Sequence, residues 1–172
     1  MNIDKLFKDK TTKAKEKVTI LGEWLCEKTI SPDELISYAI SAKDPVKASC
    51  IEALEYATKQ NPDIGSEEVL AFITKSLTEK APRIKWESAK VIGNIAHRFP
   101  NKLETAISNL LENTEHEGTV VRWSAAFALG EILKLKTPIN TTLLPALEAI
   151  SERDDKNSIR KIYLDAIKKN EK

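Results

Sequence analysis

The sequence predicts an all-α fold in which helix pairs stack into a solenoid, and three observations lead to this prediction. A motif of one apolar and one basic residue recurs four times at steps of 38, 37 and 38 residues, as Val46-Lys47, Ile84-Lys85, Val121-Arg122 and Ile159-Arg160. Each copy opens an apolar run of helical period and follows a shorter helical segment with its own start signal. No stretch alternates apolar and polar residues for long enough to indicate a strand. A fixed period of this length is typical of stacked units, which bury their apolar faces only against their neighbours.

The chain ahead of the first repeat is expected to contribute one helix. Residues 1–17 hold six lysines and three acids, and we interpret them as a solvated, partly frayed lead-in. They lack the continuous apolar core, about 7 residues or more, of a signal peptide. From 18 to 28 the apolar residues form a buried helical stripe, made of Val18, Leu21, Trp24 and Leu25. We expect a capping helix here, because the end unit of a solenoid has to cover its neighbour's apolar face.

The first helix of each pair is predicted from four start signals, which are Ser31, Ser66, Asn101 and Asn140. Ser31 forms a capping box with Glu34, and Pro32 takes the first helical position, where a missing N–H does no harm. Two acids follow Ser66 and face the positive end of the helix dipole. Asn101 has a glutamate three residues later and repeats the capping logic.

The second helices begin at Asp44-Pro45 and Ala81-Pro82 in the first two pairs, with proline again in an early position. Chain breakers separate the elements at Asn61-Pro62-Asp63, Phe99-Pro100 and Thr137-Pro138. No linker or shift in composition divides the chain. We therefore expect one domain over 1–172, with four repeats at about 31–60, 66–98, 101–136 and 140–169.

The third copy of the motif resembles the second helix of a HEAT repeat. Residues 121–130 read Val-Arg-Trp-Ser-Ala-Ala-Phe-Ala-Leu-Gly, and the HEAT pattern is Val-Arg, a run of small residues, then Ala-Leu-Gly. The second copy matches through Ile84-Lys85, Ala89 and Gly93, whereas the first and fourth lack the glycine. Residues 143–147, Leu-Leu-Pro-Ala-Leu, resemble the start of a HEAT unit. The resemblance covers roughly residues 31–169 and implies a right-handed α–α superhelix of about four helix pairs plus an N-terminal helix.

Composition narrows the classes of function. With 172 residues, 41% of them hydrophobic, the chain is long enough for a continuous core. A net charge of +1 supplies no overall field that recruits nucleic acid, and no apolar run approaches the ~20 residues of a membrane span. Cys26 and Cys50 fall on predicted helices, and for Cys50 we expect a buried free thiol rather than a disulfide. We expect a cytoplasmic protein.

The residues that carry catalytic or metal chemistry are sparse. The two histidines, His97 and His116, are separated by a helix, and neither cysteine has a histidine nearby, so no metal site is expected. His116 stands between two glutamates, and a solvated loop histidine is the favoured interpretation. The five glycines match neither glycine-rich phosphate-binding motif, the P-loop or the dinucleotide-binding fingerprint. The sequence therefore predicts a protein that is not an enzyme and uses no cofactor.

The recurring basic residues, Lys47, Lys85, Arg122 and Arg160, are expected to be structural. They lie in the first turn of their helices, where the helix dipole mildly opposes a cation. Acids stand a few residues upstream of each cation, at Asp44, Glu79, Glu117 and Asp155. HEAT-like stacks often use such acids in a ladder of ion pairs between successive repeats. We favour that ladder over a row of phosphate contacts, because the total charge is balanced.

One column of the second helices is predicted to lie outside the core on the concave face. Its members follow i, i+4, i+8 spacing, as Ala48, Glu52, Tyr56; Trp86, Lys90, Asn94; Trp123, Phe127, Glu131; Lys161, Asp165, Lys169. Trp86 and Trp123 occupy the same slot in adjacent repeats, and neighbouring helices lie about 8–10 Å apart. We therefore expect Trp86, Trp123 and Phe127 to form one contiguous aromatic patch. Charges of both signs surround it, and the predicted binding set adds Lys85, Lys90, Arg122 and Glu131.

Three functions fit these patterns, and the favoured one is a scaffold that binds a protein or peptide in the concave groove. The alternative is a nucleic-acid-binding protein similar to the HEAT-like DNA-alkylation-repair glycosylases, which bring tryptophans and basic residues to this face. Those enzymes are larger, and only Glu87 beside Trp86 could correspond to their catalytic carboxylate. A HEAT-type bilin lyase subunit is the third possibility.

Overall fold

The computed structural model describes residues 2–172, which form ten α-helices and no strand. The helices are α1 (Ile3–Lys8), α2 (Ala14–Cys26), α3 (Pro32–Ile40), α4 (Asp44–Gln60), α5 (Glu67–Ser76), α6 (Pro82–Ile95), α7 (Glu104–Asn113), α8 (Thr119–Leu133), α9 (Asn140–Arg153) and α10 (Asn157–Asn170). Short 3₁₀ turns, η1 (Pro62–Ile64) and η2 (Ala96–Arg98), follow α4 and α6. The predicted all-α solenoid of four helix pairs with an N-terminal helix is confirmed.

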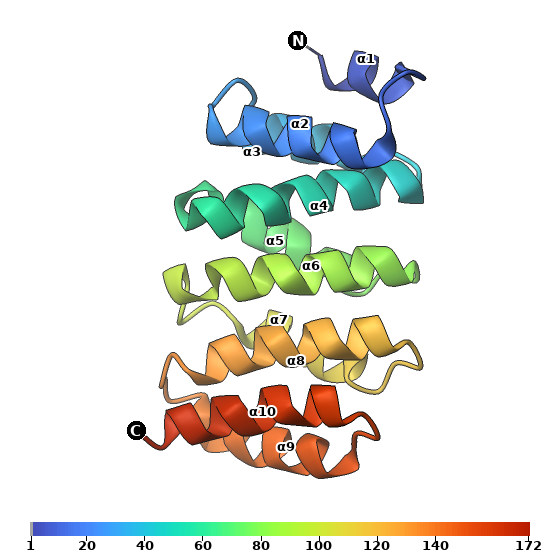
Figure 1. Cartoon of the computed structure of the whole chain (residues 1–172). Coiled ribbons are helices and arrows are strands. Elements are labelled where there is room, and N and C mark those ends of the chain that lie inside the picture. Colours follow the sequence, from blue (N-terminus) through green and yellow to red (C-terminus); the bar gives the residue numbers. More distant parts are fainter. Residues whose placement is uncertain (1) are drawn as a thin grey trace.

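The helices form two layers. In Figure 1, α2, α4, α6, α8 and α10 lie side by side in one layer, α3, α5, α7 and α9 lie behind them, and the termini are at opposite ends of the stack. Contacts between successive second helices are far more extensive than contacts between successive first helices. Closer spacing in one layer curves a solenoid toward that layer. We use the name second-helix face for the exposed surface of α2, α4, α6, α8 and α10.

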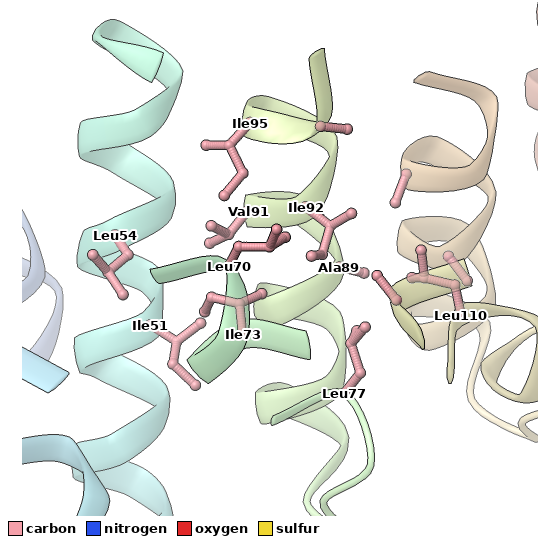
Figure 2. Packing of buried hydrophobic residues seen from close by; sticks show 14 of the residues in the cluster. Ile51, Leu54, Leu70, Ile73, Leu77, Ala89, Val91, Ile92, Ile95 and Leu110 are labelled. Carbon is pink, nitrogen blue, oxygen red and sulfur yellow. The ribbon is translucent and has the colours of Figure 1, made fainter. Parts of the chain in front are cut away.

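A continuous core runs between the layers from Ile3 to Ala166. Figure 2 shows its centre, with side chains from α4, α5, α6 and α7 directed into the space between the helices; those labelled include Ile51, Leu54, Leu70, Ile73, Ile92 and Leu110. Each fully buried side chain of this size stabilises the fold by about 1.5–3 kcal/mol relative to an exposed one. The free thiol of Cys50 is buried in this core, and burial raises its pKa to about 12.

Two of the four predicted start signals are confirmed. The Ser31 hydroxyl accepts a hydrogen bond from the Glu34 N–H at 3.1 Å, and the Glu34 carboxylate accepts one from the Ser31 N–H at 3.4 Å. Ser66 caps α5 by accepting from the Val69 N–H at 3.2 Å. These contacts satisfy N–H groups that have no partner within the helix.

The predictions for Asn101 and Asn140 are wrong. A turn occupies residues 100–102, so α7 begins only at Glu104. Asn140 is the first residue of α9 rather than its cap, and its amide donates to the Leu133 carbonyl at 2.8 Å and to Asn170 Oδ1 at 3.0 Å. Its side chain therefore joins α8, α9 and α10. These contacts span up to 30 residues, which a local capping pattern does not encode.

The expected frayed lead-in is also wrong, because residues 3–8 form α1 and pack on the stack. The Phe7 ring stacks on Tyr38 of α3 with centroids 5.7 Å apart, and the Tyr38 hydroxyl donates to Asp4 Oδ1 at 3.2 Å. The Lys17 ammonium donates to the Phe7 carbonyl at 2.9 Å. One lysine of this lysine-rich segment thus holds the chain in place. The predicted capping helix is present as α2, with Val18, Leu21 and Leu25 buried.

Small residues on α8 let it approach both neighbours. Ala125, Ala126 and Ala128 are fully buried, and a Cβ added at Gly130 would lie 3.2 Å from the Ala166 Cβ of α10. α8 is in extensive contact with α6 on one side and α10 on the other.

We expect Ala128→Leu to destabilise the protein by about 1–3 kcal/mol, because the larger side chain has to displace packed atoms. For a chain of this length that corresponds to a fall in Tm of about 2–12 °C. Thermal unfolding followed by circular dichroism measures the change. Ala149→Leu on the exposed surface of α9 is the control, and it should leave Tm nearly unchanged. An unchanged or raised Tm for Ala128→Leu would show that α8 is not tightly packed at this position.

Candidate functional site

The recurring basic residues lie at the N-terminal ends of the second helices and bind the turns of the stack. The Lys47 ammonium pairs with Glu79, and Arg122 pairs with Asp154 at 3.2 Å and Asp155 at 3.0 Å. Two rungs of the predicted ladder between successive repeats are therefore present, at Lys47 and Arg122, whereas Lys85 and Arg160 form no ion pair within residues 2–172. The predicted partners are shifted by one repeat, because Glu79 and Asp155 pair with the cation of the preceding repeat. Within residues 2–172 the carboxylates of Asp44 and Glu117 form no ion pair.

Carbonyl groups at the ends of the first helices complete the environment of these cations. Lys85 donates to the Leu77 carbonyl at 3.2 Å and to Asn113 Oδ1 at 3.3 Å. Arg122 donates to the carbonyls of residues 116 and 117, both at 3.1 Å, and Arg160 donates to the Ser151 carbonyl at 2.9 Å. Cations are favoured at the C-terminal end of a helix, where carbonyls lack partners. Lys85 and Arg160 therefore gain, from the C-terminal end of the preceding first helix, an interaction that offsets the unfavourable dipole of their own helix.

Two aromatic rings of the predicted patch form a stack on α8. The rings of Trp123 and Phe127 are nearly parallel, at 9°, with centroids 6.1 Å apart. Phe127 is half-buried because its ring lies over Gly93 of α6, where an added Cβ would come within 2.2 Å of a ring carbon. Trp123 lies further out and is 41% exposed. Val120, one turn earlier on α8, is 50% exposed and extends the same apolar stripe.

Trp86 is not a member of this stacked pair. It is half-buried on α6, and the stacked ring pairs within residues 2–172 are Phe7–Tyr38 and Trp123–Phe127. Two of the three predicted rings are therefore stacked on α8, and the contact of Trp86 with them stays a prediction. The first member of the predicted column is also misplaced, because Ala48 is buried.

A second aromatic residue lies over a glycine in the same way as Phe127. Tyr56 of α4 covers Gly22 of α2, where an added Cβ would come within 2.2 Å of the ring. The sequence carried a signal for both contacts. Glycine inside a helix is about 1 kcal/mol less favourable than alanine, so a glycine there indicates a close approach by another group.

Two charged residues of the predicted set, Lys90 and Glu131, are engaged in ion pairs on the second-helix face. Glu131 pairs with Lys134 at 2.6 Å, and Lys90 lies 3.1 Å from Glu87 and 3.7 Å from Glu55. Arg83, which was not predicted, pairs with Glu52 at 2.7 Å. The side chains of α4 and α6 thus form a polar cluster next to the aromatic residues.

Glu87 is the most unusual member of that cluster. Its side chain is only 3% exposed. Burial raises the pKa of Glu87 to about 7; Lys90 opposes this shift, and the neighbouring Glu52 carboxylate adds to it. The sequence singled out Glu87 only as a faint catalytic candidate. Its burial depends on α4, which lies a whole repeat earlier in the chain.

The side chains of residues 2–172 contain no group of three or more His, Cys, Asp and Glu residues that could hold a metal ion. His116 accepts a hydrogen bond at Nδ1 from the Gly118 N–H at 2.8 Å and shapes the turn before α8. His97 is exposed on η2. In the described part of the chain, no helix has the length and apolar character that crossing a membrane requires.

Comparison with known proteins identifies the fold. No protein-family model matches the chain, and no curated protein is similar in sequence. A designed armadillo repeat protein in complex with the peptide (KR)4 is similar in structure, with a TM-score of 0.74 and 18% identity over 98% of this chain and 80% of that one. A second designed armadillo repeat protein has a TM-score of 0.74 and 16% identity over the same shares. The chain has the fold of a HEAT/armadillo-like helical solenoid.

A third similar structure is a computationally designed armadillo repeat protein for modular peptide recognition. It has a TM-score of 0.67 and 19% identity over 78% of this chain and 62% of that one. At sequence identities of 16–19%, the similarity to these three structures is a similarity of fold.

If Arg122 has a structural role in the ladder, removing its charge should destabilise the protein. Arg122 and Asp154 are both largely buried, so Arg122→Gln should destabilise the protein by about 3 kcal/mol, as when one partner of a buried ion pair is removed. Lys134→Gln breaks the more exposed pair with Glu131 and should change stability by less than about 1 kcal/mol. Urea unfolding measures both free energies. Equal, small effects would mean that the Arg122 pair contributes little to the stack.

Proposed function

We propose that this protein is a scaffold that binds a peptide or protein segment on its second-helix face, with the Trp123–Phe127 stack as the anchor. The observation that carries the proposal is the 41% exposure of Trp123 in the middle of the stack, where a helix lies on either side of α8. Clustered apolar residues that stay exposed in a folded protein mark interaction surfaces. Rigid aromatic rings are also the commonest residues with large effects on binding.

The surroundings of the stack favour a polypeptide partner. Val120 and Trp123 supply apolar area on α8, Trp86 supplies more on α6, and Lys90 and Glu131 bring charges of both signs. An apolar centre with a mixed polar rim is the usual composition of a protein–protein interface. The fold is also that of designed armadillo proteins whose names refer to peptide recognition.

The nucleic-acid alternative finds less support. The side chains of Lys85 and Arg122 are directed to carbonyls, an amide and carboxylates of the turns, so their donors are already occupied. A polyanion surface needs several cations free to release counterions. We therefore propose a binding protein rather than an enzyme. The cytoplasmic location stays a prediction.

The proposal predicts that binding and stability separate at Trp123. Trp123→Ala should change Tm by less than about 2 °C, because an exposed side chain loses little packing. The same change should weaken partner binding by about 30-fold, which corresponds to ~2 kcal/mol at an interface anchor. Partner capture from native lysate is compared for wild type, Trp123→Ala and a Trp86/Trp123 double alanine variant. Leu164→Ala is the matched control, since Leu164 is a similarly exposed apolar residue on α10.

Two further readings complete the test. Acrylamide should quench Trp123 fluorescence strongly in a variant whose other two tryptophans are phenylalanine. Binding should weaken only slightly between ~50 and ~200 mM salt, because phosphate contacts would give a steep loss. The proposal is wrong if Trp123→Ala lowers Tm by several degrees and Trp123 is poorly quenched.

A further inference from the structure

Five charged side chains meet on the second-helix face between α4 and α6. They are Glu52 and Glu55 of α4 and Arg83, Glu87 and Lys90 of α6. Arg83 pairs with Glu52 at 2.7 Å, and its guanidinium also lies 3.4 Å from the Ser49 hydroxyl. Lys90 is shared, at 3.1 Å from Glu87 and 3.7 Å from Glu55. Three carboxylates thus face two cations, and one carboxylate has no cation of its own.

The missing positive charge matters because Glu87 is buried. An ionised carboxylate removed from water needs full pairing, and otherwise it takes up a proton. Burial raises the pKa of Glu87 to about 7, Lys90 on the same helix lowers it, and Glu52 on α4 raises it. None of the groups that shift this pKa comes from α5 or α8, which pack on other sides of α6. Near neutral pH a proton on Glu87 therefore supplies the missing charge.

The cluster is open to solvent at its outer edge. The side chains of Glu52, Arg83 and Lys90 are each about one-third exposed, while Glu55 and Glu87 lie deeper. A cation arriving from solvent meets the carboxylate of Glu52 first, and behind it the carboxylate of Glu55, whose side chain is 15% exposed. Once it pairs with Glu55, the Lys90 ammonium is left to Glu87 alone, and Glu87 is then stable as a carboxylate.

We propose that this cluster binds one cationic side chain of the bound peptide, a lysine ammonium or an arginine guanidinium, and that the incoming cation replaces a proton on Glu87. The proton leaves to solvent, so the charge of the cluster is the same before and after binding. This inference rests on the proposed peptide-binding function and adds a charge requirement to it. The buried Glu87 and the cation deficit on α4 and α6 carry it.

The position of the cluster sets the spacing of the peptide residues. The cluster lies between α4 and α6, and the Phe127 ring lies between α6 and α8, so the two are about one helix spacing apart, ~10 Å. An extended chain covers about 3.3 Å per residue. A basic residue in the cluster and an apolar residue on the Trp123–Phe127 stack would therefore be about three residues apart.

The test uses two short peptides, acetyl-Lys-Ser-Ser-Leu-amide and acetyl-Gln-Ser-Ser-Leu-amide, with NMR titration of the full chain at pH 6 and pH 8. Ionised Glu87 is the binding form, so affinity for the lysine peptide should fall by about tenfold from pH 8 to pH 6. The glutamine peptide should show no such change. Lysine peptide binding should also lower the pKa of Glu87, read from its side-chain carboxyl ¹³C shift. The carboxyl ¹³C shift of Glu87 can be measured in the wild-type protein.

Glu87→Gln should remove the pH dependence, and Glu104→Gln, which alters an exposed carboxylate on α7 in the other layer, should keep it. Equal affinity for both peptides at both pH values would overturn this inference and leave the apolar anchor standing. Shifts at Glu52 and Glu55 that persist in Trp123→Ala would support the cation site and count against the proposed anchor. Absence of binding by the lysine peptide at millimolar concentration would overturn the cation site.

Discussion

Close approach of the second helices is the constraint on which the rest of this solenoid depends. α4, α6, α8 and α10 touch one another along the whole stack, whereas the first helices mainly contact their own partners. α8 approaches α6 and α10 through small residues, which are Ala125, Ala126, Ala128 and Gly130. Packing density near that of a crystal makes each of these positions sensitive to added volume. The turns are then tied together by cations that reach into the next repeat.

The same constraint explains the candidate binding surface. Two large rings lie across a neighbouring second helix. Phe127 covers Gly93 of the preceding second helix, and Tyr56 covers Gly22. Trp123 stacks on Phe127 and is pushed outward into solvent. The anchor that we propose for peptide binding therefore follows from the packing that holds the repeats together, and the Glu87 cluster lies in the next gap between second helices.

The sequence predicted those features that depend on local patterns. The period of 37–38 residues fixed the stacked architecture, and the Ser31 and Ser66 caps follow from contacts within four residues. Several of the misses involve partners about one repeat away in the chain, including Asn140 with Asn170 and Phe7 with Tyr38. The sequence predicted ion pairs between successive repeats. Which acid pairs with which cation depends on how far one repeat is offset from the next. The burial of Glu87 beside the charged residues of α4 depends on that same offset.

The most direct test of this account is a double-mutant cycle between Gly93 and Phe127. Glycine to alanine inside a helix normally stabilises by about 1 kcal/mol. In the wild-type background, however, the new methyl group would collide with the Phe127 ring, so Gly93→Ala should lower the free energy of unfolding. In a Phe127→Ala background the ring is absent, and the same change should raise it, giving a coupling energy of about 1–3 kcal/mol. A Gly93→Ala effect of the same sign and size in both backgrounds would contradict the close approach that shapes this face.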